Sequence, residues 1–400
     1  METTRKIFPE LFFVGGNDRR LALFESNFPI PRGVSYNSYL LMDEKTVLLD
    51  TADAALGARY FDNVEQVLNG RPLDYLVIHH MEPDHAALIS ELLRRHPGVK
   101  IIGNKKTFTL LEQFYGLAPD GSAIVVGEGD TISFGKHSLT FYMAPMVHWP
   151  EAMVSYDPVS KALFSADAFG TFGALDGAVF ADEVGFDAHW LEDARRYYTN
   201  ICGKYGAQVQ ALLKKAAALD IALICPLHGP VWRRKLDYFI GLYDKWSTYT
   251  PEDREVAVFY GSMYNNTLNA VEVLCAMLVE KGVRVKAYDV ASVHVSELVS
   301  EAFRVSHLVL AAPTYNNGLY PQMASLLHDM KALNIQKRTV AVIENGSWAP
   351  QAGKLMTEAL AGMKEMTVLP ERVTIKSALK SAQRAELQAM ADAIAASIQS

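Results

Sequence analysis

The chain has 400 residues and a mass of 44.3 kDa, more than one compact core usually holds, so its length predicts two domains. Its 38 Lys and Arg against 45 Asp and Glu give a formal charge of −7, which argues against a nucleic-acid-binding or anionic-membrane protein. The sequence has no bilayer-spanning apolar run, no signal-peptide pattern and only three widely spaced cysteines, which make neither a disulfide framework nor a thiolate metal site. We therefore expect a cytoplasmic protein.

The first 250 residues contain many short apolar runs that are typical of strands, with helical stretches between them. Two apolar runs around an Asp-Glu-Lys turn predict a hairpin over Tyr39–Asp50. This mixture predicts a layered α/β sandwich over residues 1–250. Further strands are expected at Leu73–Ile78, Lys100–Gly103, Ala123–Val126, Ser138–Met143, Met153–Tyr156 and Leu163–Ser165, with a helix near Ala86–Arg95.

The turn after the strand Leu73–Ile78 gathers four potential metal ligands in six residues, His80-Met81-Glu82-Pro83-Asp84-His85. Alternation along an extended segment would place His80, Glu82 and Asp84 on one side. Burying so many ionisable groups without a metal would be costly. Because one metal cannot easily take four groups from so short a segment, we expect a two-metal site.

Three later residues, His148, Asp167 and His228, follow apolar runs and lie close to Gly or Pro, where functional loops commonly occur. Any one of them alone is more often a structural residue. We interpret them as further ligands because of the dense cluster that precedes them. The other histidines lack such company and are expected to be structural, namely His79, His96, His137, His189, His294, His307 and His328.

The pattern changes near Thr250–Asp253, where a polar break with Pro251 predicts a linker. Five strands then alternate with helices, which predicts a doubly wound five-stranded parallel sheet over residues 254–400. The strands are expected at Val256–Tyr260, Val283–Asp289, Leu308–Ala312, Thr339–Ile343 and Thr367–Leu369. The helices are expected at Thr267–Lys281, Val295–Phe303, Gln322–Leu333, Gln351–Met363 and Ser377–Ile398.

Three loops rich in hydroxyl, amide and aromatic groups follow strands of this sheet. The first opens a helix but lacks the P-loop lysine and the Gly-x-Gly-x-x-Gly pattern, so its neutral donors suit a phosphate monoester such as that of FMN. Aromatic side chains in the other two suit an isoalloxazine ring. The candidate residues are Ser262, Met263, Tyr264, Asn265, Asn266 and Thr267, then Pro313, Thr314, Tyr315, Asn316, Asn317 and Gly318, then Asn345, Gly346, Ser347 and Trp348.

The His-x-Glu-x-Asp-His turn, followed by a distant His, Asp and His, resembles the metallo-β-lactamase-type fold. Glu82 stands where the zinc hydrolases of that fold have His, and a mixed His and carboxylate set suits redox-active iron. With the runs SYNSYL (Ser35–Leu40), HWPE (His148–Glu151) and HGPVWR (His228–Arg233), the chain resembles the flavodiiron proteins, which are oxygen or nitric oxide reductases. The first flavin loop resembles that of flavodoxin. In this family the loop usually has Gly where Asn265 stands, and Asn tolerates left-handed backbone.

The resemblance implies a metallo-β-lactamase-like domain over residues 1–250 and a flavodoxin-like domain over residues 254–400. It implies FMN, a diiron site, reduction of O₂ to water or of NO to N₂O, and a rubredoxin or a reduced deazaflavin coenzyme as electron donor. It also implies a head-to-tail homodimer, alone or as a dimer of dimers. One iron would be held by His80, Glu82 and His148 and the other by Asp84, His85 and His228, with Asp167 bridging; in parts of the family the residue matching His85 stays off the metal.

Two other interpretations stay open. A dinuclear zinc hydrolase with a fused flavodoxin domain would use the same fold, although Glu82 argues against it. A non-catalytic O₂ or NO sensor or electron carrier would keep the ligands without turnover. The sequence ranks neither O₂ against NO nor the two electron donors.

Overall fold

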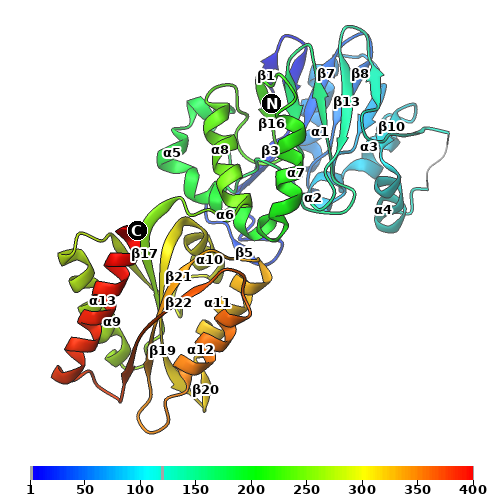
Figure 1. The fold of residues 1–400 in the computed structure, drawn as a ribbon. Helices are drawn as coiled ribbons and strands as arrows, with labels where there is room; N and C mark the ends of the chain where they lie inside the picture. Colours follow the sequence, from blue (N-terminus) through cyan, green and yellow to red (C-terminus); the bar gives the residue numbers. More distant parts are fainter. Residues whose placement is uncertain (1–2, 119–120, 400) are drawn as a thin grey trace. The chain divides into compact units, whose positions relative to one another are not determined.

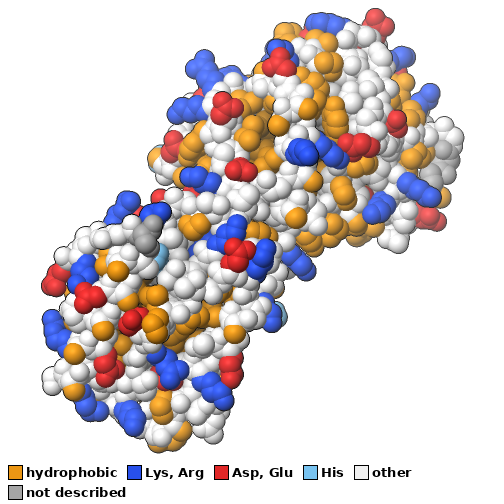
Figure 2. Space-filling view, in the orientation of Figure 1, with side chains coloured by type: hydrophobic (Ala, Val, Ile, Leu, Met, Phe, Trp, Pro, Cys, Tyr) orange, Lys and Arg blue, Asp and Glu red, His pale blue; other side chains and the backbone are white. Residues whose placement is uncertain are grey.

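The computed structural model describes residues 3–118 and 121–399, and the chain divides into two compact units (Figure 1). The first comprises Met1–Tyr198 and Tyr205–Asp244, and the second comprises Thr199–Lys204 and Lys245–Ser400. On the face shown in Figure 2, Lys and Arg side chains are interspersed with Asp and Glu. Among the described residues, no helix is long and apolar enough to cross a membrane.

The elements before residue 250 are short, and their bounds are as follows. The strands are β1 (Arg5–Phe8), β2 (Leu11–Phe13), β3 (Gly16–Asp18), β4 (Leu23–Phe24), β5 (Phe28–Pro29), β6 (Val34–Tyr36), β7 (Tyr39–Met42), β8 (Thr46–Leu49), β9 (Tyr75–Val77), β10 (Lys100–Gly103), β11 (Ala123–Val125), β12 (Thr131–Ser133), β13 (Ser138–Met143), β14 (Met153–Asp157), β15 (Ala162–Phe164) and β16 (Leu223–Cys225). The helices are α1 (Gly57–Leu68), α2 (Pro83–Ala86), α3 (Ile89–Arg95), α4 (Lys105–Tyr115), α5 (Phe186–His189), α6 (Leu191–Ile201), α7 (Gly206–Ala216) and α8 (Leu236–Ser247).

Two large β-sheets and two small two-stranded sheets, β3-β6 and β4-β5, lie in the described part of the first unit. Within the described part of the chain, one large sheet has the order β1-β2-β7-β8-β9-β10-β11 and the other has the order β12-β13-β14-β15-β16. Strands β8, β15 and β16 are buried along their whole length, which explains their mostly apolar sequences. The antiparallel pair β7 and β8 confirms the hairpin predicted over Tyr39–Asp50.

Parallel pairing places several loops of the first unit at common edges. Strand β9 lies between β8 and β10 and is parallel to both, while β15 is parallel to β16. Because parallel strands end at the same edge of a sheet, the segments that follow β8 and β9 meet, as do those that follow β15 and β16. The predicted metal ligands lie in such loops.

The second unit is a doubly wound parallel sheet, which confirms the predicted fold class. The strands are β17 (Asp253–Tyr260), β18 (Val285–Asp289), β19 (Val305–Tyr315), β20 (Gly318–Leu319), β21 (Thr339–Asn345) and β22 (Thr367–Ile375). The helices are α9 (Asn266–Glu280), α10 (Val295–Arg304), α11 (Pro321–Ala332), α12 (Ala352–Ala361) and α13 (Arg384–Gln399). In the described residues the five parallel strands have the order β18-β17-β19-β21-β22.

Helices cover both faces of this sheet, with α9 and α13 on one face and α10, α11 and α12 on the other (Figure 1). Leu274 of α9, Val309 of β19 and Met390 of α13 are each 0% exposed and belong to one core cluster. Burial of such apolar side chains contributes about 25 cal/mol per Å² to folding, and it fixes the sheet from which the flavin loops extend.

Three details of the second unit differ from the prediction. Strand β19 continues to Tyr315 and forms a hairpin with β20 through Asn316 and Asn317, whose φ angles are 47° and 57°. Strand β22 runs through Pro370, which is tolerated because β22 is an edge strand. The last helix begins at Arg384, since Ser377, its predicted start, has a left-handed φ of 68°.

Candidate metal centre and flavin pocket

The segments that follow strands of the first unit hold all seven predicted metal ligands, five in loops and two on the short helix α2. His80 and Glu82 follow β9, Asp84 and His85 lie on α2, His148 lies between β13 and β14, and Asp167 and His228 follow β15 and β16. Each of the seven is at most 9% exposed. Buried ionisable groups in such numbers need charge compensation.

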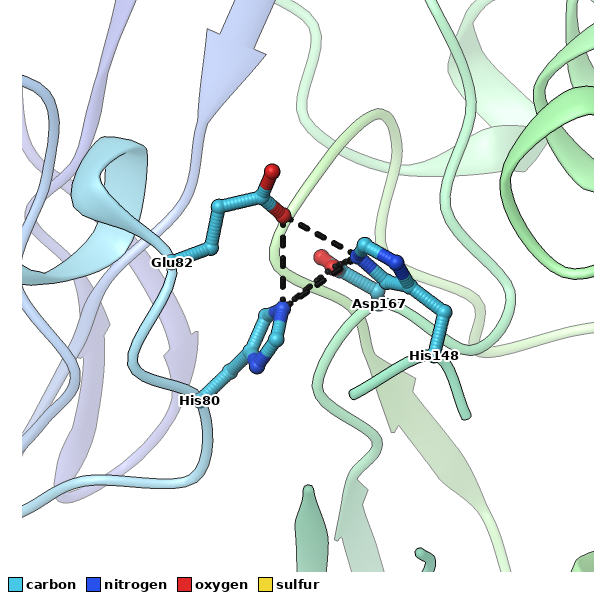
Figure 3. A group of neighbouring side chains, drawn as sticks. All are labelled: His80, Glu82, His148 and Asp167. Atoms are coloured by element: carbon cyan, nitrogen blue, oxygen red, sulfur yellow. Dashed lines mark hydrogen bonds and ion pairs between the residues drawn. The ribbon is translucent and has the colours of Figure 1, made fainter. Parts of the chain in front are cut away.

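Four of these side chains converge on one point (Figure 3). His148 Nε2 lies 3.0 Å from Glu82 Oε2 and 3.0 Å from Asp167 Oδ2. His80 Nε2 lies 3.3 Å from Glu82 Oε2, 3.2 Å from Asp167 Oδ2 and 3.3 Å from His148 Nε2. The group therefore offers two imidazole nitrogens and two carboxylate oxygens to one ion.

Asp84, His85 and His228 form a second group. The Nε2 atoms of His85 and His228 face each other at 3.1 Å. Asp84 Oδ2 lies 3.4 Å from His85 Nε2 and 3.3 Å from His228 Nε2. The Oδ1 atom of Asp167 is 3.2 Å from His85 Nε2 and 3.6 Å from His228 Nε2. Asp167 thus directs one oxygen to each group, and His85 points into the second.

The prediction that an extended segment places His80, Glu82 and Asp84 on one side is wrong for Asp84. Glu82 is extended, with ψ of 138°, but it is the N-cap residue of α2, and Pro83 occupies the first helical turn. Proline favours that position, so the chain turns helical at once. The turn then directs His80 and Glu82 to one group and Asp84 and His85 to the other.

The electrostatics of the site fit a pair of cations. In the described residues, both carboxylate oxygens of Asp84 and the Oδ1 atom of Asp167 are buried without a hydrogen-bond partner. Burial alone would lower the pKa of His85 and of His148, but neighbouring carboxylates, Asp167 among them, outweigh it and raise each pKa to about 9. The carboxylates therefore favour positive charge at this point, and a mixed imidazole and carboxylate set fits iron.

Two buried carboxylates that the sequence analysis did not single out support the turn after β9. Asp50 accepts the backbone amide of His79 at 2.7 Å, and its other oxygen lies 2.6 Å from His79 Nδ1. Glu151 Oε1 accepts the amide of Met81 at 2.9 Å and lies 2.7 Å from His80 Nδ1. His79 also contacts Ser155 Oγ at 2.7 Å, so its ring holds the fold together.

The SYNSYL run holds the loop that carries His228. The Ser35 carbonyl lies 2.8 Å from His228 Nδ1, and Ser35 Oγ accepts the amide of Gly229 at 2.7 Å. The side-chain amide of Asn37 donates to the carbonyls of Pro226 and Gly229 at 2.9 and 2.7 Å. These bonds fix which nitrogen of His228 faces the second group.

The second unit has a cavity of about 540 Å³ at the ends of its parallel strands. The three predicted flavin loops line it, joined by Ala349 and Ser377, whereas Asn265 and Gly318 do not line it. Asn265 has φ of 63° and ψ of 2° immediately before α9, so it shapes the loop. Side chains of Tyr264 and Trp348 are 84% and 88% exposed and form the rim.

Comparison with known proteins agrees with the folds of both units. The chain matches the ODP family beta lactamase model over residues 34–229 and the flavodoxin model over residues 258–388. The rubredoxin-oxygen oxidoreductase of Megalodesulfovibrio gigas is 31% identical over 98% of this chain and 97% of its own length. This chain belongs to the flavodiiron proteins. As a flavodiiron protein it is an oxidoreductase, and its cofactors are FMN and two iron ions.

Two further relatives show how far the likeness extends. The solved structure of rubredoxin oxygen:oxidoreductase from Desulfovibrio gigas superposes on this flavodiiron protein with a TM-score of 0.92, at 30% identity over 99% of this chain and 98% of the other. The anaerobic nitric oxide reductase flavorubredoxin of Pectobacterium atrosepticum is 32% identical over 84% of this chain and 67% of its own length. The metallo-β-lactamase-like and flavodoxin-like folds predicted from the sequence are thereby confirmed.

Proposed function

We propose that this flavodiiron protein reduces O₂ to water, NO to N₂O, or both, with electrons from FMN. The observation that carries the proposal is the position of Asp167, which presents one carboxylate oxygen to each of two groups of imidazole and carboxylate donors. The names of the relatives support both gases, since one is an oxygen oxidoreductase and another a nitric oxide reductase.

We assign one iron to His80, Glu82 and His148, the other to Asp84, His85 and His228, and the bridge to Asp167. When bound, the irons supply electrons to the gas and FMN supplies electrons to the irons. The chain's part is to hold the donors before any ion arrives. Glu151 contacts Nδ1 of His80, and the Ser35 carbonyl contacts Nδ1 of His228. Each contact leaves the Nε2 atom of that imidazole directed at its metal group.

Aromatic rings around His228 give the second group an apolar wall. The rings of Phe24, Tyr36 and Tyr197 lie 5.4, 5.8 and 5.5 Å from that of His228, and all three are at most 3% exposed. Burial, reinforced by Asp53, raises the pKa of Tyr36 well above its ordinary value, so its phenol stays neutral. Such a wall excludes water and suits an uncharged diatomic substrate.

Side-chain hydrogen bonds hold the flavin loops in place, and Asn345 of the third loop donates to Thr267 Oγ1 of the first at 3.3 Å. Thr314 Oγ1 accepts the amides of Gln351 and Ala352 at 2.8 and 3.1 Å, and Asn345 donates to the carbonyl of Ser377 at 2.9 Å. We assign the FMN phosphate to the loop before α9, where free amides and the helix dipole favour an anion. The exposed ring of Trp348 is then placed to cover the isoalloxazine.

We propose rubredoxin as the electron donor, since the relative from Megalodesulfovibrio gigas is named for it, with a reduced deazaflavin coenzyme as the alternative. We also propose a head-to-tail homodimer, alone or as a dimer of dimers, in which the FMN of one subunit serves the irons of the other. The exposed side chains of Tyr264 and Trp348 at the flavin pocket are consistent with a surface that becomes covered. We expect this enzyme in the cytoplasm.

The test is gas consumption by protein loaded with iron and FMN. Under anaerobic conditions, reduced rubredoxin or reduced deazaflavin coenzyme is supplied, then O₂ or NO, and both gas and donor are followed. We expect turnover with at least one gas, and loss of donor-driven turnover when FMN is removed. Binding of gas without consumption at any donor concentration would favour the sensor, and hydrolysis of thioesters by a zinc-loaded form would favour the hydrolase.

A further inference from the structure

The histidines of the two metal groups differ in what holds their far nitrogens. His80 Nδ1 lies 2.7 Å from the carboxylate of Glu151, whereas His228 Nδ1 lies 2.8 Å from the neutral carbonyl of Ser35. His85 Nδ1 is buried and has no hydrogen-bond partner within the described ranges. Of these three imidazoles, one is therefore backed by a full negative charge.

Glu151 is buried and is held in place by hydrogen bonds. The residue is 1% exposed, and its Oε1 atom accepts the Met81 amide in addition to contacting His80. Its backbone carbonyl accepts a hydrogen bond from the Asn104 side chain, while its Oε2 atom is buried and has no hydrogen-bond partner among the described residues. A buried charge of this kind acts strongly on a nearby cation, because little solvent screens it.

The carboxylates in direct contact with the ligand imidazoles are distributed unequally between the two groups. Each group has one carboxylate of its own, Glu82 or Asp84, and one oxygen of Asp167. Glu151 adds one further negative charge, and it adds it only behind His80. Negative charge beside a metal favours binding of the cation, and it favours the trivalent over the divalent state.

We propose that Glu151 makes the two metal positions unequal, so that the position at His80 binds a divalent cation first and retains the more oxidised iron. The inference rests on the iron assignment proposed above. With two ferric ions bound, the first electron from FMN would reduce the iron at His85 and His228 to the ferrous state, and the second would reduce the iron at His80. Glu151 is a positioning residue, since it acts through His80.

The first experiment titrates metal-free protein with Co²⁺ and follows the visible spectrum. Wild-type protein should bind two equivalents in two resolved steps. In Glu151→Gln the first step should weaken by about 10- to 100-fold, the usual effect of removing such a partner, while the second stays unchanged, so that the steps merge. Glu151→Asp keeps the charge and should preserve the order of binding.

Asp157→Asn is the matched control. Asp157 and His137 form a similar buried carboxylate and imidazole pair in the same unit, with 2.7 Å between Oδ2 and Nδ1, but His137 belongs to neither metal group. Asp157 ends strand β14 whereas Glu151 precedes it. This control should leave both Co²⁺ steps where they are in the wild type.

Trp149 allows the same inference to be tested without changing Glu151. Its ring lies 5.3 Å from that of His80 and 6.2 Å from that of His148. The fluorescence of Trp149 is obtained as the difference between the wild type and Trp149→Phe. This fluorescence should be quenched by the first equivalent of Co²⁺. Quenching by the second equivalent alone would overturn the proposed order even if Glu151→Gln did not fold.

The redox order has its own readout. In a reductive titration of the iron-loaded protein, the half-reduced pair gives an EPR signal whose maximal amount measures the separation of the two potentials. Glu151→Gln should lower that maximum, since it raises the potential at His80 toward that at the other position. Fewer than two bound Co²⁺ in the wild type would contradict the iron assignment. If Glu151→Gln keeps both the two resolved Co²⁺ steps and the EPR maximum of the wild type, only the role of Glu151 is overturned.

Discussion

The Nε2 atoms of His85 and His228 lie 3.1 Å apart, although 143 residues separate them in the chain. The first lies on α2 and the second follows β16, so strands of both sheets end near this point. Two imidazole nitrogens at this distance must share a proton or face a common cation, since two N–H groups would repel. The carboxylates of Asp84 and Asp167 beside them make a cation the better partner.

Asp167 is the residue on which both metal positions depend, because each of its oxygens serves one group. Asp167→Asn removes the shared charge and should weaken both Co²⁺ steps by more than about 10-fold, in contrast to Glu151→Gln, which weakens one. Iron content and gas consumption should both fall. Normal far-ultraviolet circular dichroism would show that the fold is kept, and a full iron complement in a folded Asp167→Asn would contradict the assignment.

The site could be predicted only in part from the sequence. The ligands were recognisable because four of them lie within six residues and the others follow apolar strands next to Gly or Pro. Glu151 was visible only as the last residue of the HWPE run, and its role could not be predicted, since its contact with His80 bridges 71 residues and exists only in the folded chain. For the same reason Asp50 could not be identified as the acceptor of the His79 amide.

Asn265 should be replaceable by glycine but not by alanine. Its φ of 63° lies in the left-handed region, which costs about 1–2 kcal/mol for a residue with an ordinary side chain. Asn265→Ala should therefore lower the free energy of unfolding by about 1 kcal/mol and weaken FMN binding, whereas Asn265→Gly should bind FMN at least as well as the wild type. Urea unfolding and flavin fluorescence titration measure the two effects. Equal behaviour of the two variants would show that the backbone conformation does not matter.

Trp348 should contribute to FMN affinity despite its exposure of 88% without the flavin. Stacking of an aromatic ring is worth about 0.5–1.5 kcal/mol beyond buried area, so Trp348→Ala should weaken FMN binding by up to about 10-fold. Phe114 of the first unit, 45% exposed, supplies the control, and Phe114→Ala should leave FMN affinity unchanged. An unaltered dissociation constant in Trp348→Ala would remove this residue from the flavin site.

The stability of the second unit should depend on His307 at acidic pH. Burial, with a smaller effect of Arg254, lowers the pKa of His307 from 6.5 to about 4. As the pH falls from 6.5 to 4, the unfolded chain takes up a proton that the folded chain excludes, so stability is lost in that window and kept above it. The urea concentration at the unfolding midpoint should therefore fall less between pH 7 and pH 4.5 in His307→Gln than in the wild type. Both proteins are compared at the same salt concentration, because salt screens charges. A difference between the two proteins that does not change with pH would contradict the expectation.

The fold itself was more accessible than its details. Strands β8, β15 and β16 were visible as apolar runs because they are buried along their whole length. Strands β4 and β5 have two residues each, which is too short to show the apolar and polar alternation that identifies a strand. Strand β22 was predicted to end before Pro370, because the sequence does not show that β22 lies at an edge where proline is allowed.

The most direct test of the account is the metal content of freshly purified protein that has been kept anaerobic. Two donor groups that share Asp167 and include Glu82 in place of an imidazole predict close to two irons per chain, with little zinc. Two zinc ions per chain after expression in iron-rich medium, with iron nearly absent, would contradict the account and would make the dinuclear hydrolase the better explanation of this site.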